Sequence, residues 1–445
     1  MSKVAVKTRT SMAIDLAEFR QGWRVLVLAL IGIGTSVSVA PLYAFGTMVV
    51  PMQEAFGWSR GEVQSSIAFL FASSVIAIQF TGWLNKRYGL RPVALVSLVT
   101  LPIGYLAMTL NTGSIIQLYA GYAMLAFAGL GTLQVTWTHF VNLWFDKNRG
   151  LALAIILCGT GLSGLVMPPL LTWAMELWGW RAGFWVLAIL PVALTFPMSL
   201  FWLTSSGPVG HSRTSDANAA KAVALPGMLL PEVFRSRKFW LCNFALVFFV
   251  IAMIGMLTNA VPMMRDNGLS AGEAAATFSV YGISLVIGRF LVGYLIDRLW
   301  APGVAFVVMF LPAIGCIIFF LVETYIPLLM LAAMLIGVGA GAEMDIAAFM
   351  MARYFGMRDY SRVFALHMGF ISLGSTLAPI LFAVMYDSTG SYAAMLTFCT
   401  ISFAVSACLL LTMGRYPNFS PVPPSLVVAG QAVDSIDNAA VAGER

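Results

Sequence analysis

Long apolar stretches follow one another along most of this chain, and short polar turns separate them. Each stretch has about 20 residues, the length that a helix needs to cross a hydrocarbon core roughly 30 Å thick. A spanning helix satisfies its own backbone hydrogen bonds, so we expect every stretch to be helical. The pattern predicts an all-α polytopic membrane protein with twelve transmembrane helices, near residues 25–50, 63–84, 92–110, 116–141, 151–173, 183–203, 239–261, 274–295, 303–322, 326–351, 363–385 and 392–413.

The turn after the first predicted span occurs twice. Val50, Pro51, Met52, Gly57, Ser59, Gly61 and Glu62 return 211 residues later as Val261, Pro262, Met263, Gly268, Ser270, Gly272 and Glu273. The same offset relates Gly82, Leu84 and Arg87 to Gly293, Leu295 and Arg298. We interpret this as an ancient duplication that produced two six-helix repeats. Parallel repeats of this kind build one large group of secondary transporters, in which the substrate site lies between the halves.

Composition and charge agree with a membrane protein and indicate its orientation. The chain is 60% hydrophobic and 10% charged, whereas soluble domains have roughly 25% charged residues. If the N-terminus is cytoplasmic, all but four of the 25 Lys and Arg residues fall on the cytoplasmic side. The positive-inside rule then predicts a multi-pass protein of the cell inner (plasma) membrane with both termini cytoplasmic. Because these cations flank spans, the net charge of +6 does not indicate a nucleic-acid partner.

Polar segments divide the chain into five predicted parts. These are a cytoplasmic N-terminus (1–24) without a cleavable signal, a six-helix bundle (25–203), a cytoplasmic linker (204–238), a second bundle (239–413) and a disordered cytoplasmic tail (414–445). The five cysteines all fall in predicted spans without paired spacing. We therefore expect no disulfide framework, metal site or cofactor.

Two polar turns resemble the cytoplasmic-loop signature of the major facilitator superfamily. The matching residues are Gly82, Arg87, Gly89 and Arg91 between the second and third spans, and Gly293, Asp297 and Arg298 in the second copy. The resemblance implies a two-bundle fold, alternating access and a monomeric carrier. The signature acid is Lys86 in the first copy and is present only as Asp297 in the second. The charged cytoplasmic lock that this acid forms in the family is therefore in question in the first half.

Three shorter segments resemble the monocarboxylate transporter group and its bacterial relatives, which include oxalate and formate exchangers. They are Tyr43 to Phe45, the stretch Trp144 to Gly159 with Lys147 and Arg149, and Ile287 to Arg289. Two positions of this chain differ from the pattern in the animal members of the monocarboxylate transporter group. Thr47 replaces a lysine, and Leu285 replaces an aspartate one turn before the arginine.

Arg289 is the strongest single indication of a functional site in this sequence. It lies eight residues before Asp297, hence about 12 Å inside the span. An arginine so deep costs about 2.5 to 3.5 kcal/mol on insertion scales and is kept with an anionic partner. Its repeat counterpart is Ile78, so the duplication does not explain it. The guanidinium fork suits the carboxylate of an organic acid, and the alternative is a structural ion pair with a buried acid.

Glu343 and Asp345 are the only acids well inside a predicted span. A buried carboxyl group can exchange protons near neutral pH, so either residue could couple transport to a proton gradient. Two residues apart on a helix, they point about 200° from each other and cannot share one task. The structural alternative is that one joins a cytoplasmic charge network with Arg353 or Arg358 and the other pairs with Arg289.

Other polar residues are candidates for the cavity wall. We expect Tyr43, Tyr281, Asn259 and Gln134 to contribute to substrate binding, although each could instead bridge two helices. His139 and His367 are interpreted as packed residues near the cytoplasmic ends of their helices, in preference to proton relays.

Together these observations predict a secondary active transporter of a small organic anion, a monocarboxylate, that works by proton symport. An organic-anion exchanger and a drug efflux carrier are the alternatives within transport, and Arg289 argues against the second. A transport-derived membrane sensor is the alternative from another class. An enzyme is not expected, because no nucleophile with a base and no metal cluster is apparent. The expected partners are the organic anion, protons and membrane lipid.

Overall fold

The computed structural model describes residues 16–145, 148–203, 227–296, 298–356 and 358–417, and these residues are helical almost throughout. Within them, ten helices are long and apolar enough to cross a membrane. The first half of the chain contains α1 (Leu16–Gly34), α2 (Ala40–Phe56), α3 (Arg60–Tyr88), α4 (Leu90–Met108), α5 (Ile115–Ala128), η1 (Leu130–Thr132), α6 (Gln134–Asn142), α7 (Arg149–Trp178), α8 (Arg181–Leu190), η2 (Pro191–Thr195) and α9 (Phe196–Trp202). The second half contains α11 (Leu230–Arg235), α12 (Arg237–Asp266), α13 (Ala271–Ile296), α14 (Ala301–Leu321), α15 (Ile326–Phe355), α16 (Tyr360–Thr389) and α17 (Ala393–Leu411).

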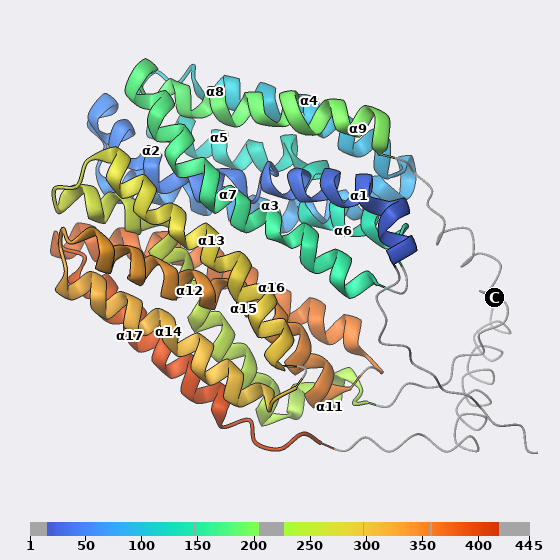
Figure 1. Ribbon diagram of the computed structural model, residues 1–445. Helices are drawn as coiled ribbons and strands as arrows, with labels where there is room; N and C mark the ends of the chain where they lie inside the picture. Colours follow the sequence, from blue (N-terminus) through green and yellow to red (C-terminus); the bar gives the residue numbers. More distant parts are fainter. Residues whose placement is uncertain (1–15, 146–147, 204–226, 297, 357, 418–445) are drawn as a thin grey trace, which may run out of the picture.

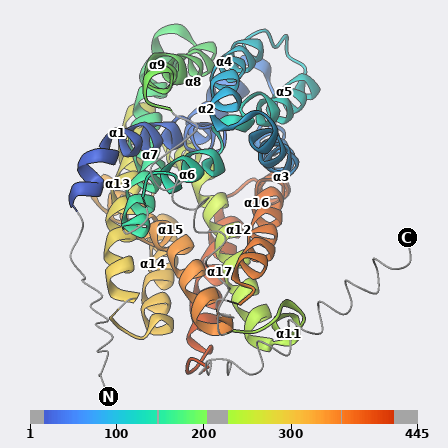
Figure 2. The same cartoon turned by 90° about the vertical axis from the view of Figure 1, so that its right-hand side faces the viewer.

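The two halves lie one above the other, with their long helices running in the same general direction (Figure 1). We call the end at which α1 begins and α17 ends the termini end, and the opposite end the distal end. Seen along the helices, the halves meet along two seams on opposite sides of the molecule (Figure 2). In one seam α3 packs against α16, and in the other α7 packs against α13.

The duplicated turn has a local physical basis. In each copy a glycine takes a positive φ, +70° at Gly57 and +100° at Gly268, which a residue with a side chain rarely adopts. The serine two residues later then caps the next helix. Ser59 accepts a hydrogen bond from the Glu62 N–H at 3.1 Å, and Ser270 accepts one from Glu273 at 3.2 Å. Both copies therefore encode the same distal turn and capping box.

The first and fourth predicted spans differ from expectation, because each is interrupted. The predicted span 25–50 is divided into α1 and α2 at residues 35–39, where Pro41 in the first turn of α2 lacks an N–H group. The predicted span 116–141 is divided into α5, η1 and α6 near Gly129. The corresponding helices of the second half, α12 and α15, are continuous over 30 residues each.

Hydroxyl side chains satisfy the backbone groups that these interruptions release. The Val37 N–H donates to Thr132 Oγ1 at 3.2 Å, so the two interruptions contact each other directly. The Gly131 N–H donates to Ser97 Oγ at 2.9 Å, and Thr81 Oγ1 donates to the Leu130 carbonyl at 3.1 Å. Such partners are what broken helices need inside a membrane, where water is absent.

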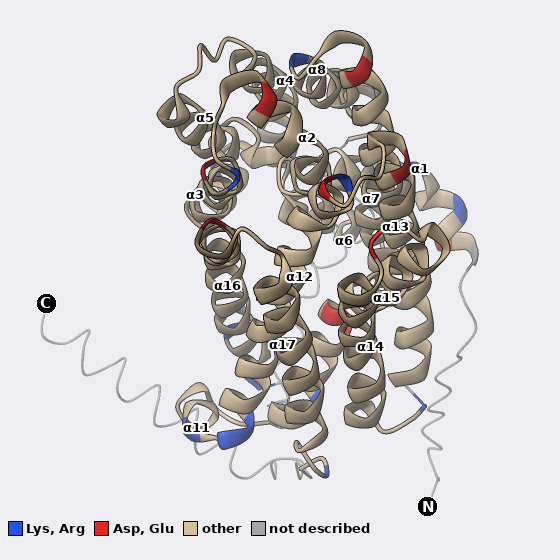
Figure 3. Cartoon of the chain, turned by 90° about the vertical axis from the view of Figure 1, so that its left-hand side faces the viewer, with Lys and Arg blue, Asp and Glu red and all other residues tan. Residues whose placement is uncertain are grey.

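Charges are distributed unequally between the two ends. Among the described residues the distal end has the acids Glu54, Glu62, Glu176, Asp266, Glu273, Glu323 and Asp387, and the bases Arg60, Arg181 and Arg265 (Figure 3). Most of the other described Lys and Arg residues lie at the termini end. Of the predicted loop signature, Gly82, Arg87, Gly89, Arg91, Gly293 and Arg298 lie at the termini end, whereas Asp297 is outside the described residues.

Candidate functional site

Close helix pairing in the second half positions Arg289. A Cβ atom added to Gly341 of α15 would lie 2.9 Å from the Arg289 backbone nitrogen. Gly337 of α15 and Gly288 of α13 make similar close approaches. Glycines at these places let α13 and α15 pack almost backbone to backbone, which fixes the base of the arginine side chain.

The second seam brings first-half residues to the same place. A Cβ atom on Gly164 of α7 would lie 3.2 Å from both the Gly282 Cα of α13 and the ring of Tyr43 on α2. The ring centroids of Tyr43 and Tyr281 are 6.0 Å apart, and Tyr281 stacks on Phe278 at 5.2 Å. Thus α2, α7, α13 and α15 converge here, and two of the predicted binding residues, Tyr43 and Tyr281, meet across the halves.

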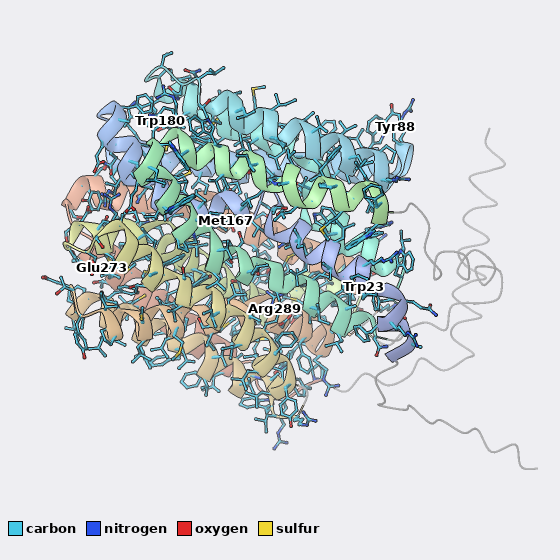
Figure 4. The ribbon with its side chains drawn as sticks, turned by 45° about the horizontal axis from the view of Figure 1, so that its top comes forward. Trp23, Tyr88, Met167, Trp180, Glu273 and Arg289 are labelled. Carbon is cyan, nitrogen blue, oxygen red and sulfur yellow. The ribbon has the colours of Figure 1, made fainter. Side chains whose placement is uncertain are left out.

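The Arg289 guanidinium has no hydrogen-bond partner for two of its three nitrogens. The side chain is only 6% exposed, and its Nε and Nη1 atoms are buried and unpaired. In Figure 4, Arg289 lies along the helices between Trp180 and Glu273 toward the distal end and Trp23 and Tyr88 toward the termini end. A buried donor without an acceptor is costly, so such a group calls for a partner.

Glu343 and Asp345 lie near this arginine without pairing with it. Both are half-buried on α15, and Arg289 acts on both electrostatically. Glu343 also interacts electrostatically with Tyr43 and Tyr281. It therefore lies near the two tyrosines as well as near Arg289. Within the described chain neither acid forms an ion pair with Arg289. The structural ion pair considered above is therefore not formed in this conformation.

Asn259 does not join this cluster. The Asn259 amide donates to the Gly255 carbonyl at 2.9 Å and to Thr258 Oγ1 at 3.1 Å, while its oxygen accepts from Gln64 of α3. Both of its donors are therefore occupied, and the residue joins the halves. Gln134 begins α6 directly after the interruption of the fourth span and is half-buried.

The sequence analysis missed a second arginine, because Arg60 precedes the predicted span 63–84. It lies in the first turn of α3 and is 7% exposed. Its Nη1 and Nη2 bind both carboxylate oxygens of Asp266, its Nε donates to Gln53 Oε1 at 3.1 Å, and its guanidinium lies 5.0 Å from the Tyr386 ring centroid. Its repeat counterpart is Ala271, and this sole charge difference between residues 57–62 and 268–273 was the available signal.

Arg60 belongs to a group of four interacting residues at the distal end, Arg60, Asp266, Asp387 and Tyr392, which we call the distal lock. The Tyr392 hydroxyl donates to Asp266 Oδ2 at 2.9 Å. The Gly61 N–H, at the start of α3, donates to Asp387 Oδ1 at 3.2 Å. The lock joins the two halves at the distal end along the α3·α16 seam.

The α7·α13 seam is open at the same level. A cavity of about 390 Å³ lies there, lined by Thr47, Glu54, Glu176, Trp180, Arg265 and other residues. Arg265 and its repeat counterpart Glu54 approach to 3.8 Å across it. Because Thr47 is one turn from Tyr43 on α2, this cavity lies distal to the Arg289 cluster. The described residues contain no group of three potential metal ligands.

The fold and site define a polytopic carrier-like protein with two related halves and a buried, unpaired arginine where they meet. The sequence model of the Major Facilitator Superfamily matches residues 26–322 and again residues 244–432. The chain belongs to this superfamily, as the loop signature predicted. It is therefore a membrane transporter and not an enzyme, and it acts on a small-molecule substrate.

Relatives with known names are similar over most of the chain. It is 27% identical over 405 residues to monocarboxylate transporter 11 of Mus musculus, covering 86% of each protein. It is 25% identical over 402 residues to monocarboxylate transporter 13 of Bos taurus, covering 88% of this chain and 87% of the relative. The predicted resemblance to the monocarboxylate transporter group is thus confirmed. A crystal structure of a D-xylose-proton symporter shares the fold with a TM-score of 0.68 at 12% identity, covering 90% of this chain and 98% of that chain.

Proposed function

We propose that the protein is a secondary active transporter of a small organic anion, a monocarboxylate, and that Arg289 holds the carboxylate. The observation that carries this proposal is the buried guanidinium whose Nε and Nη1 atoms have no partner. A carboxylate would accept two parallel hydrogen bonds from this fork and offset the cost of the buried charge. The names of the similar monocarboxylate transporters support the same class of substrate.

Alternating access would expose this site to each side in turn. In our proposal the basic termini end is cytoplasmic, in a cell inner (plasma) membrane, with both termini inside. The bundles are 25–203 and 239–413, joined by the linker 204–238, and the carrier is a monomer. The distal lock then closes the outer side along the α3·α16 seam.

Proton symport is the energetic mechanism that we favour, with Glu343 as the proton carrier. It is half-buried and interacts electrostatically with Arg289 and both tyrosines. A proton on Glu343 would remove a negative charge that competes with the substrate for Arg289. Asp345 is the second candidate, and exchange of two organic anions is the alternative mechanism.

The rival functions explain this site less well. A drug efflux carrier does not require a buried arginine, and a transport-derived sensor would not require a free guanidinium between its halves. Neither rival has a feature of its own among the described residues.

The test is uptake of labelled organic acids by proteoliposomes, with and without an inward proton gradient. We expect gradient-stimulated accumulation of a monocarboxylate by the native protein and none by Arg289→Ala. Arg289→Lys is the matched variant, since it keeps the charge and loses the fork, and it should retain weak uptake.

Three results would change the conclusion. Flux that requires an internal counter-anion would indicate exchange. Full activity of a folded Arg289→Ala variant would exclude the binding role of this residue. Absence of flux with every acid in the panel would overturn the substrate class.

A further inference from the structure

A groove between α4 and α5 opens on the outside of the bundle, away from the site between the halves. Its volume is about 770 Å³. Ile103, Ala107, Ala120, Met124 and Phe127 contribute to its wall. Ile103 is 60% exposed and Met124 is 69% exposed although both belong to apolar helices. The groove therefore faces the hydrocarbon of the membrane.

The length of the groove matches one leaflet of a bilayer. It extends along α5 from Gln117 near the distal end to Ala128, where the helix is interrupted. Eleven residues at 1.5 Å each give about 16 Å, which is close to half of a hydrocarbon core roughly 30 Å thick. At the inner end, Thr100 Oγ1 donates to the Ala128 carbonyl at 2.5 Å and closes the groove. A transmembrane helix of a partner would need a groove about twice as long.

The polar groups of the groove are concentrated at its distal mouth. Asn111 and Gln117 line it there, and Gln117 is exposed. Arg181, the first residue of α8, lies beside the end of α4, because its Nε donates to the carbonyl of Thr109, two residues before Asn111, at 3.1 Å. Its guanidinium also lies 4.5 Å from the ring centroid of Trp180. These two contacts hold an exposed cation at the level where lipid headgroups lie.

We propose that this groove binds one anionic phospholipid of the distal leaflet, with an acyl chain between α4 and α5 and the phosphate at Arg181. The apolar wall, the length of one leaflet and the anchored cation beside the distal end of α4 together fit an amphiphile with a negative headgroup. Gly104 and Gly121 let the helices approach closely behind the chain. The lipid would thereby cover the exposed face of a helix pair that includes the interrupted fourth span.

Native mass spectrometry of the purified protein tests this proposal, with phosphatidylglycerol and phosphatidylcholine of identical acyl chains as probes. The native protein should retain one phosphatidylglycerol in preference to phosphatidylcholine. Arg181→Gln should weaken retention of phosphatidylglycerol roughly fivefold, the effect of one cation near an anionic lipid surface, and leave phosphatidylcholine unchanged. Ala120→Phe fills the groove from an exposed position and should reduce retention of both lipids.

Arg265→Gln is the matched control, because Arg265 lies at the same end but lines the cavity between the halves. It should retain both lipids as the native protein does. Equal retention of the two lipids by the native protein, or native retention by Arg181→Gln, would overturn the proposal. If Ala120→Phe does not fold, Arg181→Gln alone decides, since Arg181 is exposed. Cross-linking of Ala120→Cys to a second copy, in a Cys408→Ser background, would assign the groove to a protein contact instead.

Discussion

Arg60 and Arg289 are equally buried, at 7% and 6% exposure, yet their surroundings are opposite. Arg60 binds the carboxylate of Asp266, donates to Gln53 and lies over two tyrosine rings. Two nitrogens of Arg289 have no partner at all. Each arginine also departs from the internal repeat, in which the counterparts are Ala271 and Ile78.

This difference separates a structural charge from one available to a ligand. A buried pair whose hydrogen bonds are complete holds two segments together, and here it joins the two halves at the distal end. A buried cation without a partner opposes folding until an anion arrives. Burial alone therefore does not identify a binding residue, and the unpaired donors of Arg289 are what support its proposed role.

The largest effect is expected for Arg289→Ala. Removing the fork eliminates two charge-assisted hydrogen bonds to the carboxylate, so uptake should fall by about 100-fold or more. Thermal stability should not fall, because an uncompensated charge is removed. Uptake assays combined with a thermal shift measurement check both expectations. A loss of stability as large as that of Arg60→Ala would contradict the contrast between the two residues.

Glu343→Gln should have the next largest effect. If Glu343 carries the proton, the amide cannot release one, so accumulation driven by a proton gradient should disappear. Exchange of labelled for unlabelled substrate at equilibrium should persist, because Arg289 is intact. Glu323→Gln, at an exposed distal position, is the control and should keep the gradient response. Native pH dependence in Glu343→Gln would transfer the coupling role to Asp345 or elsewhere.

Arg60→Ala should change conformation more than binding. Asp266 would lose hydrogen bonds to a charged donor, worth about 1.5 to 3 kcal/mol, so the distally open population should rise roughly tenfold or more. Spin labels at Thr112→Cys and Ser388→Cys, one in each half, would report a longer distance. Arg265→Ala should have little effect, because its contact with Glu54 is 3.8 Å long and Glu54 is largely exposed. An unchanged distance distribution in Arg60→Ala would refute the lock.

The smallest effect concerns two glycines related by the repeat. A Cβ atom on Gly61 would collide with the Asp387 carboxylate, whereas one on Gly272 would meet no atom within 4 Å. Gly61→Ala should therefore weaken the distal lock and shift the same label distance by a smaller amount than Arg60→Ala. Gly272→Ala, in α13, should leave the label distance unchanged. An equal shift in both variants would mean that the contact between Gly61 and Asp387 does not make the α3·α16 seam tighter than the α7·α13 seam.

Local features of the sequence were enough to predict most of the fold. The predicted apolar stretches correspond to ten membrane-length helices among the described residues, and the duplicated turn encodes a left-handed glycine and a helix cap. The prediction that the first and fourth spans are single continuous helices was wrong. Their interruptions depend on hydroxyl groups of Thr132, Ser97 and Thr81, which come from other segments of the chain. No periodicity within a span reveals such partners.

The candidate site was accessible from the sequence only in part. Arg289 was conspicuous because a charge inside an apolar run is costly wherever its helix lies. Arg60 was not, because the edge of a span is an ordinary place for a cation until Asp266 is found against it. Asn259 had the right chemistry for a binding residue, but Gln64 of the other half occupies its carbonyl oxygen.

By itself the sequence determined the membrane environment, the repeat and the depth of Arg289, since these follow from the length and local order of apolar residues. Only the tertiary structure decided which charges are paired. Pairing depends on contacts between helices that lie far apart in the chain, such as Arg60 with Asp266. The same contacts decided that Tyr43 and Tyr281 meet near a guanidinium left without a partner.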